Sequence, residues 1–417
     1  MEYGLIGEKL SHSFSKTVHK ELFDYNYELK EIAPQNLDSF MKKADFKAIN
    51  VTIPYKQSVI SYLDEIDETA KKTGAVNTVV NKNGKLFGYN TDYFGLRDLI
   101  VNAGISLSAK KVLILGSGGT SLTAKTVAED MGAKELYRVS RTGKGGLITY
   151  EEVLKSHIDA DIIINTTPCG MYPNTSEMPI DIDKFTNISG VVDAVYNPIN
   201  SLLVVKAKEK GIKATGGLYM LIAQAVYAAE KFTESAVPND TVKKIYNKIF
   251  NQKCNLVLIG MPGCGKTTIG KILAKKMSKS FIDCDEEIIK ITGKTIPKIF
   301  EEYGEAYFRD LESKVISEKS KLQSCVIATG GGAVLREKNI EMLKQNGRVI
   351  FLDRPLEKLT VTDDRPLSAN RELLQKRYNE RYEVYLSAAD DRIFSAGEIE
   401  ETLSKAEEVL LSENSRN

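Results

Sequence analysis

Residues 260–267 limit what this chain can fold into more than any other part of the sequence. They read Gly-Met-Pro-Gly-Cys-Gly-Lys-Thr and fit G-x-x-x-x-G-K-[ST], a loop whose backbone N–H groups surround nucleotide phosphates. The apolar run 255–259 predicts a buried strand before the loop, and apolar residues at helical spacing in 269–277 predict a helix after it. Such a helix would point its N-terminus at the phosphates. A chance match by a glycine-rich turn is the alternative, and the flanking strand and helix argue against it.

Each residue type in this loop has a physical reason to be there. Glycines let the backbone turn tightly and approach an anion without a Cβ clash. Lys266 supplies a positive charge for the β- and γ-phosphates, and the hydroxyl of Thr267 suits Mg²⁺. The residues expected to bind the nucleotide are Gly263, Cys264, Gly265, Lys266, Thr267 and Thr268.

Composition describes an ordinary chain of two or three domains. Its 417 residues are 42% hydrophobic and 27% charged, and the formal net charge is +1, so nothing favours binding to nucleic acid or to a membrane. Five cysteines without a C-x-x-C pair favour a reducing compartment. Three histidines lack metal-ligand spacing, and no signal peptide or long apolar run is present. We therefore expect a cytoplasmic α/β protein without a metal cluster.

In the first hundred residues, polar groups follow several predicted strands. Serines and a histidine in residues 11–15 follow the strand 4–7, and Lys56 follows the strand that Pro54 is expected to end. Residues 74–78 and 88–92 add Asn77 and Asp92 to further loops. Ligands of α/β sheets bind at such edges, although serines before a helix are often caps and Asn, Asp and Gly are common turn residues.

A dinucleotide-binding pattern begins near residue 110. The apolar strand 111–115 is followed by Gly116-Ser117-Gly118-Gly119 and a helix that reaches Met131. This G-x-G-G loop is by itself a moderate signal. The next strand, 136–139, is followed by Arg141, where NAD-selective sites carry an acidic residue that binds the ribose. An arginine can instead bind a 2′-phosphate, so the sequence favours NADP over NAD.

Later segments of this half add loops and one long helix. Strands at 161–165 and 190–193 lead into the loops 166–171 and 196–198. A helix that begins near Gly216 carries Gln224 as one of its few polar residues. The residues themselves leave open whether this glutamine binds a ligand or fills a packing gap.

Taken together, residues 1 to about 250 resemble shikimate dehydrogenase. The resemblance rests on motifs that occur in the family's order: Ser13-Phe14-Ser15, Asn50-Val51-Thr52-Ile53-Pro54-Tyr55-Lys56, Ala75-Val76-Asn77-Thr78, Asn90-Thr91-Asp92, Gly116-Ser117-Gly118-Gly119, Tyr196-Asn197-Pro198 and Met220-Leu221-Ile222-Ala223-Gln224-Ala225. Lys16, Lys20 and Ser140 depart from the family pattern, which puts the local helix entry and the cofactor affinity in question.

The resemblance implies roles for individual residues. Lys56 and Asp92 would be the catalytic pair. Substrate would be bound by Ser13, Ser15, Thr52, Asn77, Asp92, Tyr196 and Gln224. NADP(H) would be bound by Gly116, Ser117, Gly118, Gly119, Thr120, Ser140, Arg141, Thr142 and Gly217. A cationic Lys56 can stabilise the charge that grows on a ketone oxygen and deliver the proton, whereas an exposed Lys–Asp salt bridge would contribute little.

The join between the two halves is expected to be short. Residues 240–250 predict an amphipathic closing helix, and 251–254 would be a linker. We expect a substrate-binding domain at 1–100 with a return helix from about 217–250, an NADP-binding Rossmann-type domain at 101–250, and a kinase-like domain at 255–417.

The second half contains further candidate site residues. Residues 281–285 predict a strand that would place Asp283 and Asp285 on one face. Arg309 and Glu312 lie one helical turn apart, and residues 329–332 offer a bare glycine edge that a ligand could approach. Residues 360–370 read as a mobile loop, and Arg381 and Tyr385 belong to a late helix.

Residues 255 to about 410 resemble shikimate kinase, a P-loop fold with a parallel sheet. The resemblance rests on the phosphate loop, Asp283-Cys284-Asp285, Gly304-Glu305 with Phe308-Arg309, the triple glycine, Arg365-Pro366-Leu367, and Arg381 four residues before Tyr385. It implies that Asp285 binds and polarises the acceptor hydroxyl, that Arg309 and Arg381 bind the carboxylate, and that Gly331 and Gly332 approach the ring. Asp283 would act on Mg²⁺ through water, and Arg365 on a lid would neutralise charge during transfer of phosphate from ATP.

The two resemblances name consecutive reactions. The first half would reduce 3-dehydroshikimate to shikimate with NADPH, and the second would phosphorylate shikimate with Mg-ATP, as a monomer or homodimer in aromatic amino acid biosynthesis. One alternative is a quinate dehydrogenase joined to another small-molecule kinase. Another is that one half is an inactive regulatory module, against which the retained charged residues of both sites argue.

Overall fold

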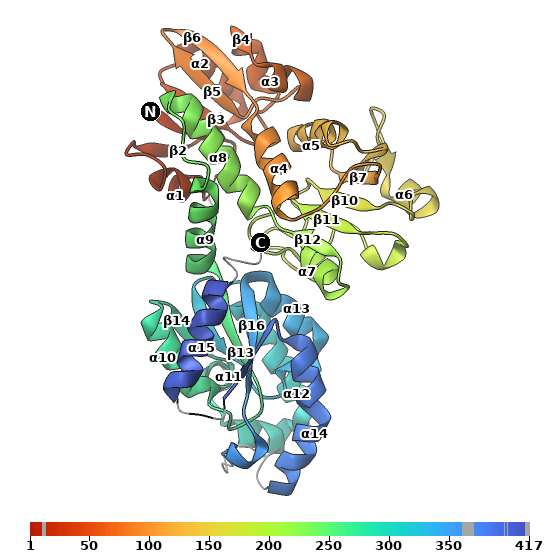
Figure 1. Ribbon diagram of the computed structural model, residues 1–417, viewed down its shortest axis with the longest axis vertical. Helices are drawn as coiled ribbons and strands as arrows, with labels where there is room; N and C mark the ends of the chain where they lie inside the picture. Colours follow the sequence, from red (N-terminus) through yellow and green to blue (C-terminus); the bar gives the residue numbers. More distant parts are fainter. Residues whose placement is uncertain (11–13, 361–370, 396, 398, 413–417) are drawn as a thin grey trace. The chain divides into compact units, whose positions relative to one another are not determined.

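The computed structural model describes residues 1–10, 14–360, 371–395, 397 and 399–412. The chain forms two compact units, Met1–Lys248 and Ile249–Asn417, built on three sheets with helices packed against them (Figure 1). The predicted α/β fold class is confirmed. Two predicted site residues, Ser13 and Arg365, lie outside the described residues. In the described part of the chain, no helix has the length and apolar character needed to span a membrane.

The first unit begins with a mixed sheet of six strands in the order β2-β1-β3-β5-β6-β4. Strands β1 to β3 are parallel, and β5 runs antiparallel to β3 and β6. The bounds of its strands and helices are β1 Tyr3–Gly7, α1 Ser15–Lys20, β2 Tyr27–Glu31, α2 Leu37–Lys43, β3 Ala48–Val51, β4 Glu65–Ile66, α3 Glu68–Thr73, β5 Thr78–Lys82, β6 Lys85–Tyr89 and α4 Thr91–Asn102.

A second, fully parallel sheet of the first unit has the order β12-β11-β10-β7-β8-β9. Its central strands β10 and β11 are buried at every residue, which explains their continuous apolar sequences. The bounds are β7 Lys111–Leu115, α5 Gly119–Asp130, β8 Glu135–Ser140, β9 Ile148–Thr149, α6 Tyr150–Ser156, β10 Ile162–Asn165, β11 Gly190–Asp193, α7 Leu202–Glu209, β12 Lys213–Thr215 and α8 Leu218–Thr233.

Helices α4 and α8 pack side by side between the two sheets (Figure 1). Leu99 and Ile100 of α4 share a core with Met220 of α8 and with Ile114 of β7. The later part of α8, including Phe232, packs instead against the first sheet. Helices α4 and α8 therefore connect the two sheets of the first unit and bring loops of both sheets close to each other.

Helix α9, Thr241–Lys253, replaces the predicted linker. The residues expected to be linker, 251–253, continue the helix, and the boundary between the two units falls inside it. Lys279 donates hydrogen bonds to the carbonyls of Asn251, Gln252 and Cys254 at distances of 2.7, 3.1 and 2.9 Å. These bonds satisfy carbonyl groups that a helix end otherwise leaves unpaired. A lysine 25 or more residues away supplies them, which is why the local sequence did not reveal the longer helix.

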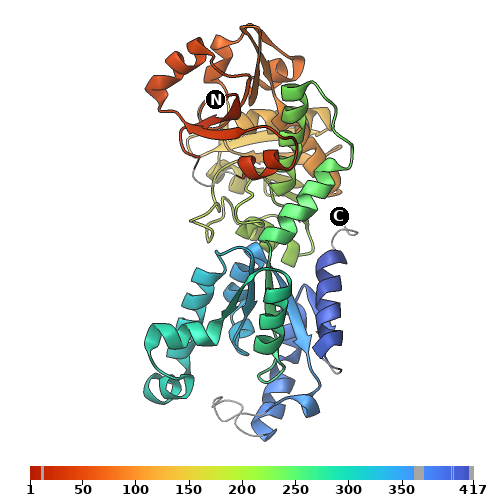
Figure 2. The same ribbon diagram turned by 90° about the vertical axis from the view of Figure 1, so that its left-hand side faces the viewer.

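The second unit is a parallel five-stranded sheet in the order β14-β15-β13-β16-β17 with helices around it (Figure 2). Helix α12 contains a break at Gly304, whose φ is 79°. The bounds are β13 Asn255–Ile259, α10 Lys266–Lys276, β14 Ser280–Asp283, α11 Cys284–Thr292, α12 Ile296–Lys319, β15 Cys325–Ala328, α13 Glu337–Asn346, β16 Gly347–Asp353, α14 Arg371–Ala388, β17 Asp391–Phe394 and α15 Ile399–Ser412.

The core between the two sheets of the first unit predicts that substitutions at two nearby positions of α4 change the free energy of unfolding by very different amounts. Leu99 is 0% exposed and Val101, on the same helix, is 62% exposed. Leu99→Ala should lower the free energy of unfolding by about 2–5 kcal/mol, because it leaves a cavity. Val101→Ala should change it by less than about 0.5 kcal/mol. Urea unfolding followed by circular dichroism measures both, and equal losses would contradict the packing described for α4.

Candidate active sites

Lys56 and Asp92 form a shielded ion pair in the first unit. The Lys56 Nζ donates to Asp92 Oδ2 at 2.5 Å, and the two side chains are only 13% and 9% exposed. Lys56 lies in a turn after β3, which ends at Val51, earlier than the predicted end at Pro54. Asp92 lies in the first turn of α4. Because this pair is shielded from water, it is not an exposed salt bridge, which was the alternative interpretation of these two residues.

Asn77 links the start of α4 to α8. Its Oδ1 accepts from the N–H of Thr91 at 2.7 Å, and its Nδ2 donates to Thr91 Oγ1 at 3.0 Å and to Gln224 Oε1 at 3.4 Å. Gln224 also donates to the carbonyl of Leu221 at 2.7 Å. Two predicted site residues, Asn77 and Gln224, are thus joined by a hydrogen bond next to the start of α4, where Asp92 lies, and Gln224 has a structural role as well.

The predicted dinucleotide loop lies directly against Lys56. Gly119 is the first residue of α5, and a Cβ added to it would lie 3.3 Å from the Cβ of Lys56. Gly116 has φ +131°, and its Cβ would lie 2.4 Å from Thr166 Oγ1. A side chain at Gly116 would therefore collide with Thr166, and one at Gly119 would crowd Lys56. Gly119 lies at the N-terminus of α5, a position where phosphates bind in proteins.

The predicted basic end of β8 is exposed. Arg141 and Thr142 face solvent, and the hydroxyl of Ser140 accepts from the N–H of Gly143 at 3.0 Å. Sequence reasoning missed Arg138, which donates to Ser121 Oγ at 2.8 Å and to the carbonyl of Ser117 at 3.4 Å. Arg138 thereby supports the glycine loop from the neighbouring strand, a contact that no spacing in the sequence indicates.

Further predicted residues lie at the ends of nearby elements. The ring of Tyr196 lies 5.4 Å from that of Phe14, beside the buried Ser15 of α1. The N–H of Gly217 donates to the carbonyl of Val195 at 2.8 Å, at the start of α8. The N–H of Thr52 donates to the carbonyl of Ile6 at 2.9 Å, at the end of β3.

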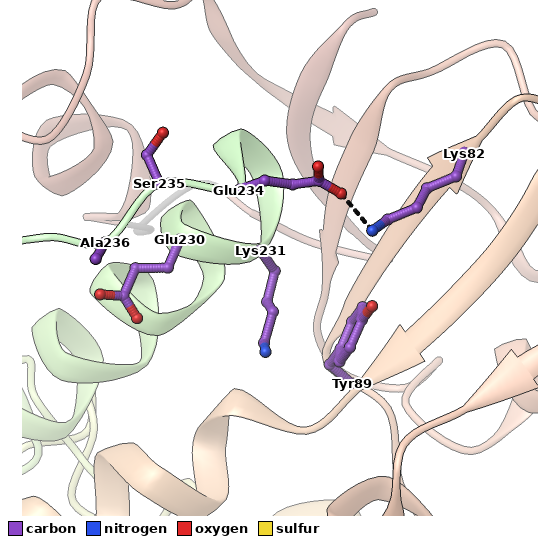
Figure 3. A pocket seen from close by; sticks show the side chains of 7 residues that line it. All are labelled: Lys82, Tyr89, Glu230, Lys231, Glu234, Ser235 and Ala236. Carbon is purple, nitrogen blue, oxygen red and sulfur yellow. Dashed lines mark hydrogen bonds and ion pairs between the residues drawn. The ribbon is translucent and has the colours of Figure 1, made fainter.

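A polar hollow elsewhere on the first unit contains none of the predicted site residues. Figure 3 shows the ion pair of Lys82 with Glu234 at its rim. The hollow is lined by Lys82, Tyr89, Glu230, Lys231, Glu234, Ser235 and Ala236. Lys231 lies over the ring of Tyr89, 5.1 Å from its centroid, and no group there is placed for the predicted chemistry.

In the second unit, the loop between β13 and α10 has the geometry of a phosphate cradle. Gly260, Gly263 and Gly265 have φ of +147°, +81° and +98°, a region that favours glycine. Lys266 is 9% exposed. Its ammonium donates to the carbonyls of Gly260 and Met261 at 2.8 and 3.1 Å. The loop thus has a buried cation and the N-terminus of α10 beside it, as phosphate binding requires.

Thr267 and Asp283 place oxygen atoms next to this loop. The hydroxyl of Thr267 donates to Asp283 Oδ2 at 2.7 Å. The prediction that a strand carries both Asp283 and Asp285 is wrong, because β14 ends at Asp283, which caps α11 by accepting from the N–H groups of Asp285 and Glu286. The carboxylate–N–H bonds of the cap outcompete strand continuation. A hydroxyl and a carboxylate are hard oxygen donors that suit Mg²⁺.

The triple glycine after β15 forms an edge surrounded by charged side chains. A Cβ on Gly330 would lie 2.5 Å from Glu312 Oε1 and 2.9 Å from Asp285 Oδ1, and one on Gly332 would lie 2.2 Å from Arg309 Nη1. Asp285 and Arg309 are thereby brought to one edge, with Glu312 behind them. Only glycine leaves space for these side chains.

Arg309 and Arg381 are held at this edge by separate contacts. Arg309 pairs with Glu312 at 2.8 Å and with Glu305 at 3.1 Å. Burial raises the pKa of Glu312, whose Oε1 has no hydrogen-bond partner among the described residues. Arg381 Nη1 and Tyr385 Oη donate to the carbonyl of Gly331 at 3.0 and 2.5 Å.

The glycine edge also touches the phosphate loop. A Cβ on Gly331 would lie 2.8 Å from the ring of Pro262, so the glycine edge and the phosphate loop are adjacent. Sequence reasoning missed Arg354, whose Nη1 lies 3.8 Å from the position of a Cβ on Gly265. It also left out Glu312 as a site residue, although the spacing to Arg309 was noted.

Comparisons with known proteins identify both halves. A family model for the shikimate dehydrogenase substrate binding domain matches residues 5–79, and one for shikimate kinase matches residues 262–411. The NADP(+) shikimate dehydrogenase of Clostridium beijerinckii is 40% identical over 267 residues, which are 60% of this chain and 98% of that protein. The crystal structure of shikimate dehydrogenase 1 from Peptoclostridium difficile has a TM-score of 0.56 and 38% identity, and covers 60% of this chain and 98% of that one.

A second solved structure has a ligand-bound site. Shikimate 5-dehydrogenase from Thermus thermophilus, in complex with NADP(H) and shikimate, has a TM-score of 0.53 and 26% identity, and covers 60% of this chain and 99% of that one. The dehydrogenase relatives are thus matched nearly over their full length. The chain belongs to the shikimate dehydrogenase family and carries a shikimate kinase domain after it, which makes it a bifunctional enzyme of the shikimate pathway.

Proposed function

We propose that the first unit reduces 3-dehydroshikimate to shikimate with NADPH and that the second unit phosphorylates shikimate with Mg-ATP. The observation that carries the first reaction is the shielded Lys56–Asp92 pair directly against Gly119 of the dinucleotide loop. The second reaction is supported by the glycine edge of Gly331 in contact with Pro262 of the phosphate loop. Each unit thus has acceptor and cofactor groups side by side.

In the dehydrogenase, Lys56 is the proton donor and the electrostatic stabiliser. The reduced nicotinamide supplies the hydride. Lys56 places a positive charge where negative charge develops on the ketone oxygen, and then transfers its proton to that oxygen. Asp92 keeps the ammonium oriented through its 2.5 Å hydrogen bond and can accept from a substrate hydroxyl.

The remaining residues proposed for this unit bind and orient. Ser13, Ser15, Thr52, Asn77, Tyr196 and Gln224 bind the carboxylate and hydroxyls of the substrate. The glycines of the loop let the pyrophosphate approach the N-terminus of α5. Arg141, exposed after β8, binds the 2′-phosphate of NADP(H), with Ser140, Thr142 and Gly217 completing the cofactor site.

In the kinase, catalysis depends on positioning and charge neutralisation. ATP supplies the phosphoryl group. Lys266 and the N–H groups of its loop hold the β- and γ-phosphates, while Thr267 and Asp283 hold Mg²⁺. Asp285 orients and polarises the acceptor hydroxyl, Arg309 and Arg381 bind the acceptor carboxylate, and Gly331 and Gly332 lie along its ring. Arg365 is proposed to neutralise charge during transfer.

The two reactions in series can be tested in one cuvette. NADPH and 3-dehydroshikimate should react until equilibrium, and Mg-ATP added afterwards should restart NADPH loss, because the kinase removes shikimate. Lys56→Ala should abolish both phases, and Lys266→Ala only the restart. The measurement is NADPH absorbance together with detection of an acid-sugar phosphate. An ATP addition that changes nothing would contradict the kinase assignment, and no NADPH loss at all would contradict the dehydrogenase assignment.

The proposed role of Arg141 predicts a change in cofactor preference. Arg141→Ala should raise the KM for NADP⁺ about tenfold through loss of one charge-assisted hydrogen bond, and should leave the KM for NAD⁺ nearly unchanged. Lys144 is a neighbouring exposed cation. The control is Lys144→Ala, which should have a smaller effect on the KM for NADP⁺. Steady-state kinetics with both cofactors measure the difference, and a parallel rise for NAD⁺ would refute the 2′-phosphate contact.

Arg309 has two carboxylate partners that differ in exposure, which gives a matched comparison. Glu312 is 0% exposed and Glu305 is 47% exposed. Glu312→Gln should raise the kinase KM for shikimate about tenfold or more, because Arg309 loses its buried counter-charge. Glu305→Gln should change it by less than about threefold. The KM for ATP should stay the same in both variants, and equal effects would show that burial does not decide which partner matters.

A further inference from the structure

A buried carboxylate at the end of β11 has no role in the chemistry described so far. Asp193 is 0% exposed, and two polar residues that contact it are equally buried: Asn165 at the end of β10 (0%) and Ser201 at the start of α7 (1%). All three lie at the carboxyl edge of the parallel sheet, where α/β folds place their ligands. A buried carboxylate is costly unless its oxygens are hydrogen-bonded, so its partners show what it holds in place.

Asp193 accepts hydrogen bonds from three neutral donors. Its Oδ1 accepts from Asn165 Nδ2 at 2.9 Å and from the N–H of Val195 at 2.9 Å, and its Oδ2 accepts from Ser201 Oγ at 2.5 Å. The same Ser201 hydroxyl caps α7 by accepting from the N–H of Val204 at 3.4 Å. One carboxylate thus joins β10, the beginning of the segment 194–200 and the first turn of α7.

The segment 194–200 is therefore fixed at both of its ends, and it contains Tyr196. Its neighbours are tied to it as well, because the N–H of Tyr172 donates to the carbonyl of Asn197 at 2.8 Å and that of Gly217 to the carbonyl of Val195 at 2.8 Å. Asn165 connects the same hydrogen-bond network to the loop after β10, because its Oδ1 accepts from the N–H and the hydroxyl of Thr167.

We propose that Asp193 is a positioning residue of the dehydrogenase, which holds the segment 194–200 so that Tyr196 can contact the substrate. This inference rests on the proposed dehydrogenase reaction and on the substrate role of Tyr196. Asp193 itself is 0% exposed, so it acts through Tyr196 and not on the reacting atoms. Ser201 is its partner in this role.

The charge of Asp193 gives the positioning a pH dependence. Burial raises the pKa of Asp193 from 3.8 to about 7. When ionised, its Oδ1 accepts more strongly from Asn165 and Val195, and Oδ2 accepts from Ser201. When protonated, Oδ2 has to donate to Ser201 and both Oδ1 bonds weaken. Among the described residues, the titratable group that Asp193 influences is Cys169, in the segment between β10 and β11: burial raises the pKa of that thiol, and the charges of Glu177 and Asp193 raise it further.

Stability and substrate binding should consequently respond to pH in opposite directions. The pKa of Asp193 rises from 3.8 to about 7 on folding, so its contribution to stability is fully present below 3.8 and is lost progressively as pH rises from there through about 7. The segment 194–200, in contrast, is held more firmly above that pH. A role limited to folding would make substrate binding weaken as stability falls.

The test compares the full-length protein with Asp193→Asn and Ser201→Ala. Shikimate oxidation by NADP⁺, without ATP, gives the KM for each substrate at about pH 6 and pH 8, and thermal unfolding is followed in the same buffers. In Asp193→Asn the KM for shikimate should rise about tenfold, as expected for loss of a hydrogen bond, with little change in the KM for NADP⁺. The wild-type KM for shikimate should fall from pH 6 to pH 8. Asp193→Asn should not show this fall, and Ser201→Ala should show a smaller one, because its Asp193 still ionises but has lost the bond to Oδ2.

A double substitution separates positioning from general damage. If Asp193 acts through Tyr196, Asp193→Asn should raise the KM for shikimate much less in a Tyr196→Phe background than in the wild type. Full additivity of the two changes would overturn the proposal, as would an unchanged KM and pH profile in both single variants. If Asp193→Asn does not fold, Ser201→Ala decides by the same criteria. Wild-type protein that does not oxidise shikimate would instead refute the proposed dehydrogenase function.

Discussion

A parallel strand covered by helices on both faces can place polar side chains only at its ends, because its middle is surrounded by apolar groups. The strands β10, β11, β13 and β15 are buried at every residue. The groups proposed to do chemistry accordingly lie in the loops and helix starts that follow such strands. Lys56 follows β3, Gly119 follows β7, Thr267 follows β13, and the triple glycine follows β15. The architecture of both units thus determines where polar groups can gather.

Burial of charge imposes a second constraint, which is met in two different ways. Asp92 has the ammonium of Lys56 as its counter-charge, and Glu312 has the guanidinium of Arg309. Among the described residues, the donors to Asp193 are all neutral, and burial raises its pKa to about 7. A paired carboxylate keeps its neighbouring cation oriented for a ligand, while an unpaired one holds backbone segments in place and responds to pH. The same side-chain type therefore serves binding in one place and positioning in another.

Close approach of backbone and side chains explains several of the glycines. At Gly332 a Cβ would occupy the position of the Arg309 guanidinium, and at Gly331 it would meet Pro262. At Gly119 a Cβ would press on Lys56. Each of these glycines permits a contact between elements that are distant in the sequence. The motif patterns thus report on tertiary contacts as well as on turn geometry.

Much of the fold could be predicted from the sequence, because apolar periodicity and glycine-rich loops are local signals. Strands such as β7 and β13 and the helices that follow the glycine loops were expected and are confirmed. The errors have two causes, a distant residue in one case and a local helix cap in the other. Lys279 caps the end of α9, so the expected linker is helical, and the capping bonds of Asp283 turn the predicted strand 281–285 into a helix start.

The sequence by itself determined the α/β fold class, the two enzyme families and the motif residues, because these depend on residue order. Only the tertiary structure decided which of these residues meet. It buried the Lys56–Asp92 pair, placed Arg138 behind the glycine loop and put Arg354 beside Gly265. It also joined Asn165, Asp193 and Ser201, which lie on three different elements. The physical reason is that burial and hydrogen-bond partners come from parts of the chain that are far apart in sequence, and no local pattern encodes their distance.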